Sequence, residues 1–452
     1  MAKKYDLVIV GAGPGGAMAA KTAGENGLKT AIIERKTNPA AITRGCAMMF
    51  AIESDYYFAE RMYYNEKSKK MIFPVNGLTV DYDGPTRNFY AWHFYAPDGK
   101  TRFEFGDYEE SIKKGDKGRL SLVYDKGKLI EGLMRDAVKN GLEVFTGVNV
   151  TGIEKTAGGV KVTGNGDTFE GTFVIGADGT GSRVAKLMGF NKERRFYGPA
   201  PGITYYVTGV KIPQSEAVIT AIFSKPNTLN SSFFWVIPSP YADDEYWISV
   251  RTKEDFEYVT KESVFSKWFT EIKVKRFLSF VSSMWSPVSE PYRDNVLLVG
   301  DSAWYGEAEI TGSMMCGWRA ANAVTVALRD NKPDREGVLN YLEWWKRSYP
   351  EFDDYRNFMM FFLFCFVLSE EEVNYLYGLF KSPLRSTLNP FLVARIVKKA
   401  LEPLMSRIRE EMPSLVEKLK MLEIDNIEES ILTLKKSQYL KEYGNEKDNV
   451  KE

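Results

Sequence analysis

The 452-residue sequence has a single histidine and only three cysteines. With His93 as the one imidazole, the chain lacks the ligands for a His-rich metal site, and a Ser-His-Asp hydrolase would depend on that residue alone. Cys46, Cys316 and Cys365 are too few for a disulfide framework. We therefore predict no metal site, and we expect neither triad hydrolysis nor a small disulfide-stabilised protein.

Net charge is lacking as well, because 60 Lys and Arg balance 60 Asp and Glu. The balance gives no overall attraction to nucleic acid, so no nucleic-acid partner is expected. Long apolar runs are also missing: residues 358–368 form the longest, and as a helix they would span about half of the roughly 30 Å hydrocarbon core of a bilayer. That run predicts a buried helix, or a segment that lies against a lipid or lines a lipid-shaped pocket.

No secretory signal precedes the first predicted strand, because Met1 to Lys4 lead directly into it. We therefore expect a cytoplasmic protein, with peripheral contact with a membrane as an open alternative. Aromatic residues are abundant, with 28 Phe, 25 Tyr and 9 Trp, and 44% of all residues are hydrophobic. Length and apolar content predict a folded chain of two or three structural units.

The first forty residues have the pattern of a strand, a glycine-rich turn, a helix and a second strand. Residues 5–10 and 30–33 are apolar and rich in β-branched side chains, residues 11–16 read GAGPGG, and residues 17–27 are rich in alanine. A nucleotide-binding layer is therefore expected to begin at this point of the chain.

Gly11, Gly13 and Gly16 have the GxGxxG spacing, and Glu34 closes the second predicted strand. In a dinucleotide site the first glycine permits the tight turn, the second lets the backbone approach the pyrophosphate, and the third allows close packing. The helix N-terminus supplies N–H groups for the diphosphate, and Glu34 would accept hydrogen bonds from a ribose. The turn predicts a bound FAD or NAD.

Two later segments have the form of motifs that accompany this turn in a known group of flavoproteins. The segment VIGADGTGSR contains Asp178 and Gly179, and the segment LLVGDSA contains Gly300 and Asp301. With these segments the chain resembles the glutathione-reductase-type flavoproteins that include para-hydroxybenzoate hydroxylase, the flavin-dependent halogenases and the geranylgeranyl reductases. The resemblance implies FAD as the cofactor, with Asp178 and Gly179 beside it and the Asp301 carboxylate accepting a bond from its ribityl chain.

Gly312 and Ser313 resemble the family's glycine-rich start of a long helix whose N-terminus points toward the pyrimidine ring of the flavin. N–H donors and the helix dipole stabilise an electron-rich reduced flavin at such a place. Ala308, Glu309 and Ser313 stand where the family has a proline and a glycine pair. The resemblance places Gly312 and Ser313 among the cofactor contacts.

The segment Arg44-Gly45-Cys46 follows the second predicted strand, where the prenyl reductases carry a cysteine near the flavin. Ala47 replaces the glycine that follows this cysteine in the family. The match implies that Arg44 and Cys46 lie beside the cofactor, with a buried structural cysteine as the alternative. Cys46 is our candidate for a catalytic residue, and Tyr206 or water is another candidate proton source.

The segment NSSFFWVIP points to two branches of the family. It is similar to the geranylgeranyl-reductase motif Pro-x-x-Tyr-x-Trp-x-Phe-Pro, of which it keeps Trp235 and Pro238, with Asn230 in place of the first proline. It equally resembles the halogenase motif Trp-x-Trp-x-Ile-Pro, with Phe233 in place of the first tryptophan. An ordinary aromatic strand packed on the core is the third interpretation.

Aromatic residues crowd two predicted insertions and the C-terminal region, and such surfaces can bury a long apolar chain at about 0.8 kcal/mol per methylene. We therefore expect an isoprenoid or other apolar substrate. The predicted substrate contacts are Trp92, Phe233, Trp235 and Pro238, and further aromatic residues of this kind near the C-terminus are Phe361, Phe362, Phe364 and Phe366.

The predicted fold class is α/β, with a Rossmann-like FAD-binding domain, β-rich substrate-domain insertions and a C-terminal helical region. The predicted FAD-binding domain comprises residues 1–45, 119–195 and 291–330, the β-rich substrate domain 46–118 and 196–290, and the helical region 331–452.

The leading functional prediction is an FAD-dependent oxidoreductase of the geranylgeranyl reductase type, which saturates carbon-carbon double bonds by hydride transfer from reduced flavin. The alternatives are a monooxygenase or halogenase that acts through a flavin C4a-hydroperoxide, and a flavin fold used only for electron transfer or as a structural module. Since no second GxGxxG is present, the electron donor is expected to be a transiently bound NAD(P)H or a ferredoxin.

Overall fold

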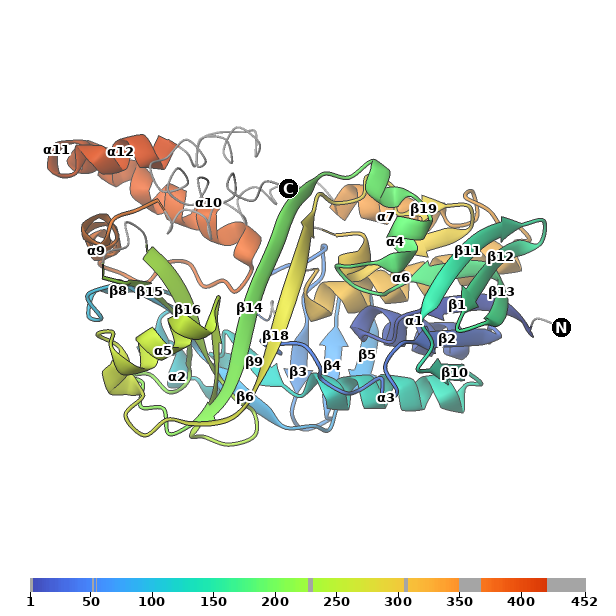
Figure 1. Ribbon diagram of the computed structural model, residues 1–452, viewed down its shortest axis with the longest axis horizontal. Helices are drawn as coiled ribbons and strands as arrows, with labels where there is room; N and C mark the ends of the chain where they lie inside the picture. The colour runs from blue at the N-terminus through green and yellow to red at the C-terminus, as the bar shows by residue number, and fades with distance from the viewer. Residues whose placement is uncertain are drawn as a thin grey trace, which may run out of the picture.

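The computed structural model describes residues 3–420 apart from 51, 52, 54, 227–230, 305–307 and 349–366. Six residues named above lie outside this part of the chain: Asn230, Phe361, Phe362, Phe364, Cys365 and Phe366. Residues 358–366 of the apolar run, which predicted a buried helix or a lipid contact, lie outside it too. The described residues form a mixed α/β structure with two large sheets and a group of C-terminal helices (Figure 1), so the predicted fold class is confirmed.

The first large sheet has eight strands and begins at the N-terminus. Its strands are β1 (Lys3–Val10), β2 (Thr30–Glu34), β10 (Glu143–Thr146), β11 (Val150–Thr156), β12 (Gly159–Gly164), β13 (Asp167–Gly176), β19 (Tyr292–Arg293) and β20 (Val296–Leu298). The order is β10-β2-β1-β13-β12-β11, with β20 beside β13 and β19 beside β20. The pairs β10/β2, β2/β1, β1/β13 and β13/β20 are parallel. Every residue of β2 is buried, as expected for a parallel strand covered on both faces.

Three helices pack together beside this sheet: α1 (Pro14–Glu25), α3 (Lys126–Lys139) and α6 (Glu309–Arg329). Helix α1 starts earlier than predicted, because Gly13 is its N-cap and Pro14 occupies the first turn, where proline is favoured. Helices α1 and α6 approach closely at two glycines: a Cβ atom on Gly317 would lie 2.0 Å from the carbonyl oxygen of Gly15. This contact brings the first turns of both helices to the same edge of the sheet.

The second large sheet has seven strands and comes from the two predicted insertions. Its strands are β7 (Ala91–Tyr95), β8 (Arg102–Phe105), β14 (Phe196–Thr208), β15 (Ala217–Ser224), β16 (Ser231–Pro238), β17 (Glu245–Val250) and β18 (Lys273–Trp285). Their order is β18-β14-β17-β16-β15-β7-β8, and helix α5 (Lys253–Lys261) packs on one face. The other face turns toward the nucleotide-binding layer.

Smaller elements join the two layers. They are β3 (Tyr63–Asn65), β4 (Lys70–Phe73), β5 (Leu78–Asp81), the pair β6 (Thr86–Phe89) and β9 (Ser121–Tyr124), and the short helices α2 (Tyr108–Ile112) and α4 (Arg183–Leu187). The sequence Pro97-Asp98-Gly99 predicts a turn, and this turn closes the β7/β8 hairpin, with Gly99 at φ +67°. The sequence Asp83-Gly84-Pro85 also predicts a turn, but it connects β5 and β6, which belong to different sheets.

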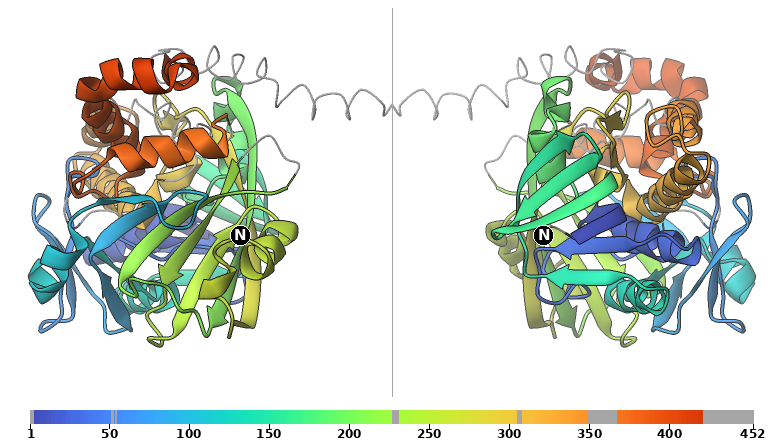
Figure 2. Two further views of the ribbon diagram at one scale, coloured as in Figure 1. Left: turned by 90° about the vertical axis from the view of Figure 1, so that its left-hand side faces the viewer. Right: turned by 90° about the vertical axis from the view of Figure 1, so that its right-hand side faces the viewer.

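The C-terminal part is helical, with α7 (Leu339–Ser348), α9 (Glu370–Leu379), α10 (Pro390–Leu401), α11 (Met405–Glu411) and α12 (Pro413–Leu419). The prolines of Asn389-Pro390 and Met412-Pro413 predict breaks between helices, and Asn389 and Met412 are the N-caps of α10 and α12. Figures 1 and 2 show α9 to α12 gathered beside the second sheet. The ring of Tyr377 packs edge-on against Phe103 of β8 at 4.8 Å, so this helical group has a direct contact with the sheet.

One predicted strand is wrong in its extent. The apolar pattern of residues 142–150 predicts a single strand. In the structure, Gly147 adopts φ +71° and β10 ends before it, and β11 starts at Val150 at the opposite edge of the sheet. The predicted domain boundaries stay predictions. No helix among the described residues is long and apolar enough to cross a membrane.

A glycine-to-alanine change should have opposite effects on stability inside and outside the contact between α1 and α6. Gly317→Ala should lower the free energy of unfolding by about 1–3 kcal/mol, because the new methyl group overlaps backbone atoms. Gly378→Ala in α9 is the matched control, since its nearest neighbour to the new Cβ lies 3.7 Å away, and it should stabilise the protein by roughly 0.5 kcal/mol. Urea unfolding measures both, and equal stability of the two variants would contradict the account.

Candidate active site

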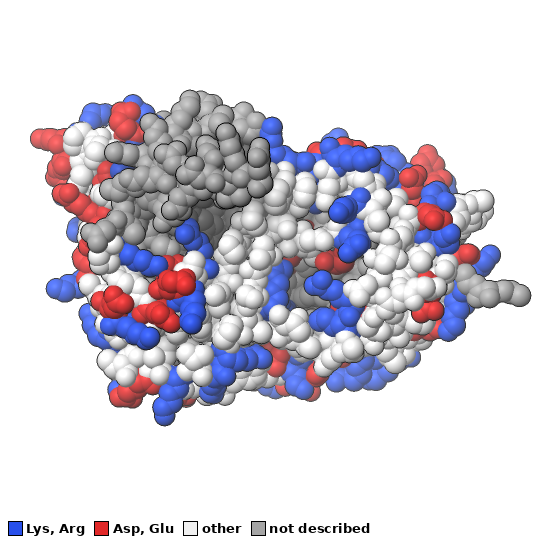
Figure 3. Space-filling view, viewed as in Figure 1, with Lys and Arg blue, Asp and Glu red and all other residues white. Residues whose placement is uncertain are grey.

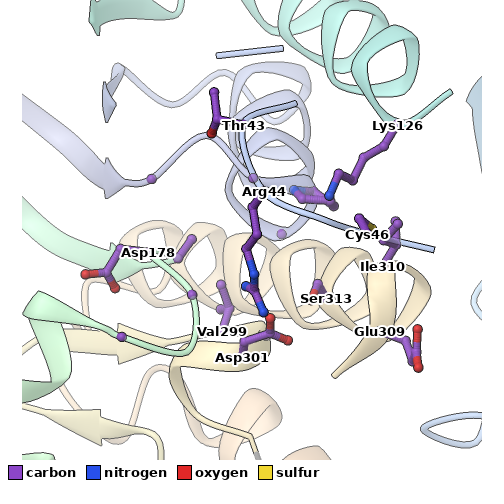
Figure 4. A pocket seen from close by; sticks show the side chains of 18 of the residues that line it. Thr43, Arg44, Cys46, Lys126, Asp178, Val299, Asp301, Glu309, Ile310 and Ser313 are labelled. Carbon is purple, nitrogen blue, oxygen red and sulfur yellow. The ribbon is translucent and has the colours of Figure 1, made fainter. Parts of the chain in front are cut away.

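A cavity of about 470 Å³ lies at the carboxyl ends of the parallel strands. The loops that follow β1, β2, β13 and β20 line it, and so do residues at the start of α6 (Figure 4). Ligands of open α/β sheets bind at this edge, outside the carboxyl ends of the strands. The position therefore matches the expected nucleotide site.

The three glycines of the turn have different surroundings. Gly11 adopts φ +99°, and a Cβ there would lie 2.5 Å from the carbonyl oxygen of Ala177. A Cβ on Gly16 would lie 1.9 Å from the carbonyl oxygen of Gly11, so Gly16 serves packing and does not line the cavity. Gly13 has open space around its Cβ position, which lets a ligand approach the backbone.

Glu34 lines the cavity from the end of β2 and is buried. Its two carboxylate oxygens accept hydrogen bonds from the backbone N–H groups of Ala12 and Lys36, each at 2.8 Å. These bonds hold the carboxylate in one orientation at the cavity wall. Its contact with a ribose stays a prediction.

Five cationic side chains line the cavity: Arg35, Lys36, Arg44, Lys126 and Arg183. Burial lowers the pKa of Lys36, and the neighbouring charges of Lys126 and Arg35 add to that effect although Glu34 opposes it. An anion such as a diphosphate, bound between these groups, would offset the repulsion among the three cations and compensate Lys36 for its lost contact with water. In Figure 3 the surface is hollowed near its centre, and Lys and Arg side chains border the hollow.

The sequence analysis missed Lys36 and Lys126 as candidate cofactor contacts. Arg35 and Lys36 directly follow Glu34, and this pair of cations was a local signal for the role of Lys36. Lys126 lies in the first turn of α3, 90 residues further along the chain, and only the tertiary fold brings it to the cavity.

Arg44 and Asp301 face each other across the site. Figure 4 shows the guanidinium of Arg44 pointing toward the Asp301 carboxylate. Arg44 also donates to the hydroxyl of Ser282 at 2.8 Å, and Asp301 accepts from the backbone N–H of Ala308 at 2.7 Å. Both predicted cofactor contacts therefore line the cavity with fixed side chains.

Asp178 has a second task that the sequence did not reveal. Its carboxylate accepts hydrogen bonds from the Ser182 hydroxyl at 2.6 Å and from the backbone of Arg183 and Val184 at 2.6 and 3.1 Å. It therefore caps the start of α4, and burial raises its pKa. Gly179 follows at φ +82°, and both residues line the cavity.

The start of α6 agrees only partly with the predicted cofactor contacts. Ser313 lines the cavity, and Gly300 packs against it, since a Cβ on Gly300 would lie 2.7 Å from the Ser313 hydroxyl. Gly312 does not line the cavity, because its open side faces the rings of Tyr57 and Phe58, at 2.7 and 2.6 Å from the Cβ position. Glu309, which was not predicted to act, lines the cavity with φ +57°.

Of the two predicted catalytic residues, Cys46 and Tyr206, only the first lines the cavity. Cys46 is half-buried and lines the cavity. Tyr206 does not line it; the ring is buried on β14, with the Arg276 guanidinium 4.3 Å from its centroid. Burial raises the pKa of Tyr206 to about 12, with a further contribution from nearby Cys46. Tyr206 therefore stands behind Cys46 as seen from the cavity.

An apolar wall continues the cavity beyond Cys46. Trp92, Val218 and Trp235 form it from the adjacent strands β7, β15 and β16, and Leu388 and Pro390 close it from the C-terminal region. The indole N–H of Trp92 donates to the Thr220 hydroxyl at 2.8 Å, which fixes the ring.

Two predicted substrate contacts do not line this wall. Pro238 is an odd number of residues from Trp235 on β16, so it lies on the opposite face of the sheet. Phe233 shares the face of Trp235, with ring centroids 6.0 Å apart, but it packs in the cluster that contains Leu376 and Leu401 of the C-terminal helices. The predictions for Trp92 and Trp235 remain compatible with the cavity.

Residues 4–305 match the family model described as an FAD binding domain. The chain belongs to this FAD-binding family. The cavity fits the cofactor, since it combines open space at Gly13, a fixed acidic residue at the end of β2 and a cluster of cations. The flavoprotein is an FAD-dependent oxidoreductase.

Relatives of this flavoprotein include the digeranylgeranylglycerophospholipid reductase of Methanococcus vannielii, with 23% identity over 88% of this chain and 96% of the relative. Digeranylgeranylglycerophospholipid reductase 1 of Methanococcoides burtonii has 22% identity over 77% of this chain and 81% of the relative. The predicted resemblance to the geranylgeranyl reductases is confirmed by these matches.

Solved structures share the fold of the flavoprotein. A geranylgeranyl bacteriochlorophyll reductase-like protein from Thermoplasma acidophilum superposes with a TM-score of 0.64 at 17% identity, over 93% of this chain and all of that one. A mutant halogenase in complex with FAD superposes with a TM-score of 0.56 at 13% identity, over 98% and 97% of the two chains. At these identities the two likenesses concern the fold alone.

The cation cluster predicts which lysine of α3 supports FAD binding. Lys126→Ala should weaken the affinity for FAD tenfold or more, because a charge-assisted hydrogen bond contributes about 1.5–3 kcal/mol. Lys128→Ala is the control, since Lys128 pairs with Glu131 at the surface at 2.9 Å and does not line the cavity. Titration of the apoprotein with FAD measures both, and an equal loss in the two variants would refute a role of Lys126.

Proposed function

We propose that this flavoprotein saturates carbon-carbon double bonds in an isoprenoid chain of the geranylgeranyl type. One observation carries the proposal: the cavity that the glycine turn and the cations line is also lined by Cys46 and by the apolar side chains of Trp92, Trp235 and Leu388, against which Cys46 packs. The sequence relatives, which bear the name of reductases of geranylgeranyl lipids, support the same substrate class.

The residues that would hold FAD are those that line the polar part of the cavity. The glycine turn and the first turn of α1 present N–H groups to the diphosphate, and Lys126 and Arg44 supply positive charge. Glu34 would bind the ribose, and Asp301 the ribityl chain. When bound and reduced, FAD supplies a hydride.

The apolar wall would position the substrate. The rings of Trp92 and Trp235 and the side chain of Leu388 present an apolar surface to a hydrocarbon chain. Because an unactivated alkene has no polar group to grip, its orientation depends on the shape of this wall. The same side chains exclude water from the reacting carbons.

A proton must reach the alkene carbon that does not receive the hydride. The Cys46 thiol is our candidate for this donor, because it lines the cavity between the polar and apolar parts. Glu309 is the second candidate, since its carboxyl group lines the same end of the cavity. Tyr206, the other residue predicted to act as a proton source, does not line the cavity.

The proposal also covers the electron donor and contact with a membrane. The reducing partner would be NAD(P)H, bound transiently, or a ferredoxin, because the sequence has one GxGxxG. A lipid substrate implies that a cytoplasmic protein collects it by contact with a membrane surface.

The direct test mixes the dithionite-reduced holoenzyme, without oxygen, with a geranylgeranyl ether phospholipid in detergent. We expect oxidised flavin to appear in the absorption spectrum and the lipid to gain the mass of two hydrogen atoms per saturated bond. An oxygen-using enzyme would leave the lipid unchanged under these conditions and would consume oxygen when it is admitted. That second result would replace the proposal with the monooxygenase or halogenase alternative.

The role of Cys46 predicts the behaviour of two variants. Cys46→Ala should lower the turnover of the lipid about 10²-fold or more, because general acid catalysis contributes that much. The FAD content should stay unchanged, since the small side chain of Cys46 lies beyond the cation cluster. Glu309→Gln should retain turnover, and a loss in Glu309→Gln together with full activity of Cys46→Ala would transfer the donor role to Glu309.

A further inference from the structure

An irregular segment between α9 and α10 runs through the interior of the protein. Thr387, Leu388 and Asn389 belong to neither a helix nor a strand, yet all three are buried. Loops normally lie on the surface, because buried backbone groups need hydrogen-bond partners. Leu388 and the following Pro390 line the cavity, so this segment forms part of the apolar wall.

Both ends of the segment are held by neighbouring elements. At its start, the backbone N–H of Leu384 donates to the carbonyl of Glu104 on β8 at 2.8 Å, and the carbonyl of Leu384 accepts from Gly106 at 3.1 Å. At its end, the ring of Phe391 packs near that of Tyr57, with centroids 6.3 Å apart. The part of the segment that lines the cavity lies between these two attachments.

The carboxylate of Asp55 holds this middle part. It accepts hydrogen bonds from the guanidinium of Arg385 at 2.7 Å and from the hydroxyl of Thr387. The same Thr387 oxygen accepts from the backbone N–H of Asn389 at 3.1 Å, and the Asn389 side chain accepts from the N–H of Phe391 at 3.0 Å, which caps α10. One carboxylate thereby fixes the backbone before and after the cavity-lining side chains.

Asp55 stands on a firm support. Glu53 forms a two-pronged ion pair with Arg119, in which the Nη2–Oε1 distance is 2.6 Å and both side chains are largely buried. On the other side of Asp55, the ring of Phe58 lies 2.6 Å from the Cβ position of Gly312 on α6. The segment that carries Asp55 is therefore fixed to the helix whose first turn lines the cavity.

The partners of Asp55 are what make its burial tolerable. Its side chain is 0% exposed, and burial raises its pKa, although the hydrogen bonds from Thr387 and Arg385 oppose that effect. A buried carboxylate that loses its partners is strongly destabilising. The three side chains therefore form one unit, and removal of any member releases the segment from the others.

We infer that Asp55 is a positioning residue for substrate binding, which acts through Thr387 and Arg385 to hold Leu388 and Pro390 in the apolar wall. The inference rests on the proposed function, which assigns this wall to an isoprenoid chain. A chain gains affinity from the apolar area that it buries against a wall already in place, and a wall that must first be ordered lowers that affinity. Asp55 itself does not line the cavity, so its effect is on binding and not on the transfer of a proton or hydride.

The first measurement follows amide hydrogen exchange by mass spectrometry in the oxidised holoenzyme, which requires no substrate. Asp55→Asn weakens the acceptor, and Thr387→Val removes the hydroxyl while it keeps the branched shape. In both variants the amides of residues 387–391 should exchange at least tenfold faster than in the wild type, since local opening sets this rate. Thr387→Ser keeps the hydroxyl and should exchange at the wild-type rate. Unchanged exchange in Asp55→Asn and Thr387→Val would overturn the inference.

The second measurement is steady-state reduction of the geranylgeranyl ether phospholipid in detergent, with dithionite as the reductant and without oxygen. Asp55→Asn and Thr387→Val should raise KM tenfold or more and change kcat less than threefold, because a lost contact that is the same in the ground state and the transition state raises KM alone. The FAD content should stay at the wild-type level. A fall in kcat at unchanged KM would contradict a role in substrate binding.

Glu60→Gln is the matched control. Glu60 is a buried carboxylate of the same segment, but it accepts from the backbone N–H groups of Val75 at 3.0 Å and Asn76 at 2.8 Å and has no part in the unit around Asp55. This variant should melt at a lower temperature and keep the wild-type KM and the wild-type exchange of residues 387–391. A raised KM in Glu60→Gln as well would assign the effect to general loss of stability and overturn the inference.

The proposed function and the inference can fail separately. If the wild-type enzyme leaves the lipid unchanged, the proposed function is wrong, and the exchange experiment alone decides whether Asp55 holds the wall. If the lipid is reduced and exchange accelerates in Asp55→Asn while KM keeps its wild-type value, the proposed function stands and the role of Asp55 in substrate binding is refuted.

Discussion

The site depends on the contact between α1 and α6 at Gly15 and Gly317, where a Cβ atom on Gly317 would lie 2.0 Å from the carbonyl oxygen of Gly15. Because neither glycine has a side chain, the two helices can lie almost backbone to backbone, and their first turns reach the carboxyl edge of the same sheet. The GAGPGG turn and the cavity-lining start of α6 thereby share one wall of one cavity. A bulkier residue at either position would push the glycine turn and the start of α6 apart.

The cavity joins two environments with different physical tasks. Cations, a fixed carboxylate and a helix N-terminus at one end suit a charged cofactor. Tryptophan rings and Leu388 at the other end suit a hydrocarbon chain. Between them lie Cys46 and two non-glycine residues with positive φ, Met48 and Glu309. Unfavourable backbone conformations beside a cavity are expected where stability has been given up for function.

Local chemistry explains what the sequence could predict. The tight turn at Gly11, the close packing of Gly16 and the caps at Asn389 and Met412 depend on near neighbours in the chain, so the spacing of residue types indicated them. Gly312, Pro238 and Asp178 show what local patterns do not predict. Which face of a helix or strand Gly312 and Pro238 occupy depends on packing between distant segments. The hydrogen bonds of Asp178 to the start of α4 also depend on how the chain folds after β13. Lys126 reaches the site only through the tertiary fold, and no local pattern distinguishes it.

The central claim is that one continuous cavity holds the cofactor and an isoprenoid chain side by side. A crystal structure of the holoenzyme with a bound geranylgeranyl ether phospholipid tests it most directly. The account predicts FAD along the glycine turn and the cations, with the isoprenoid chain between the flavin ring and the wall formed by Trp92, Trp235 and Leu388. Density for the chain at a separate site, with the wall closed against the flavin, would contradict it.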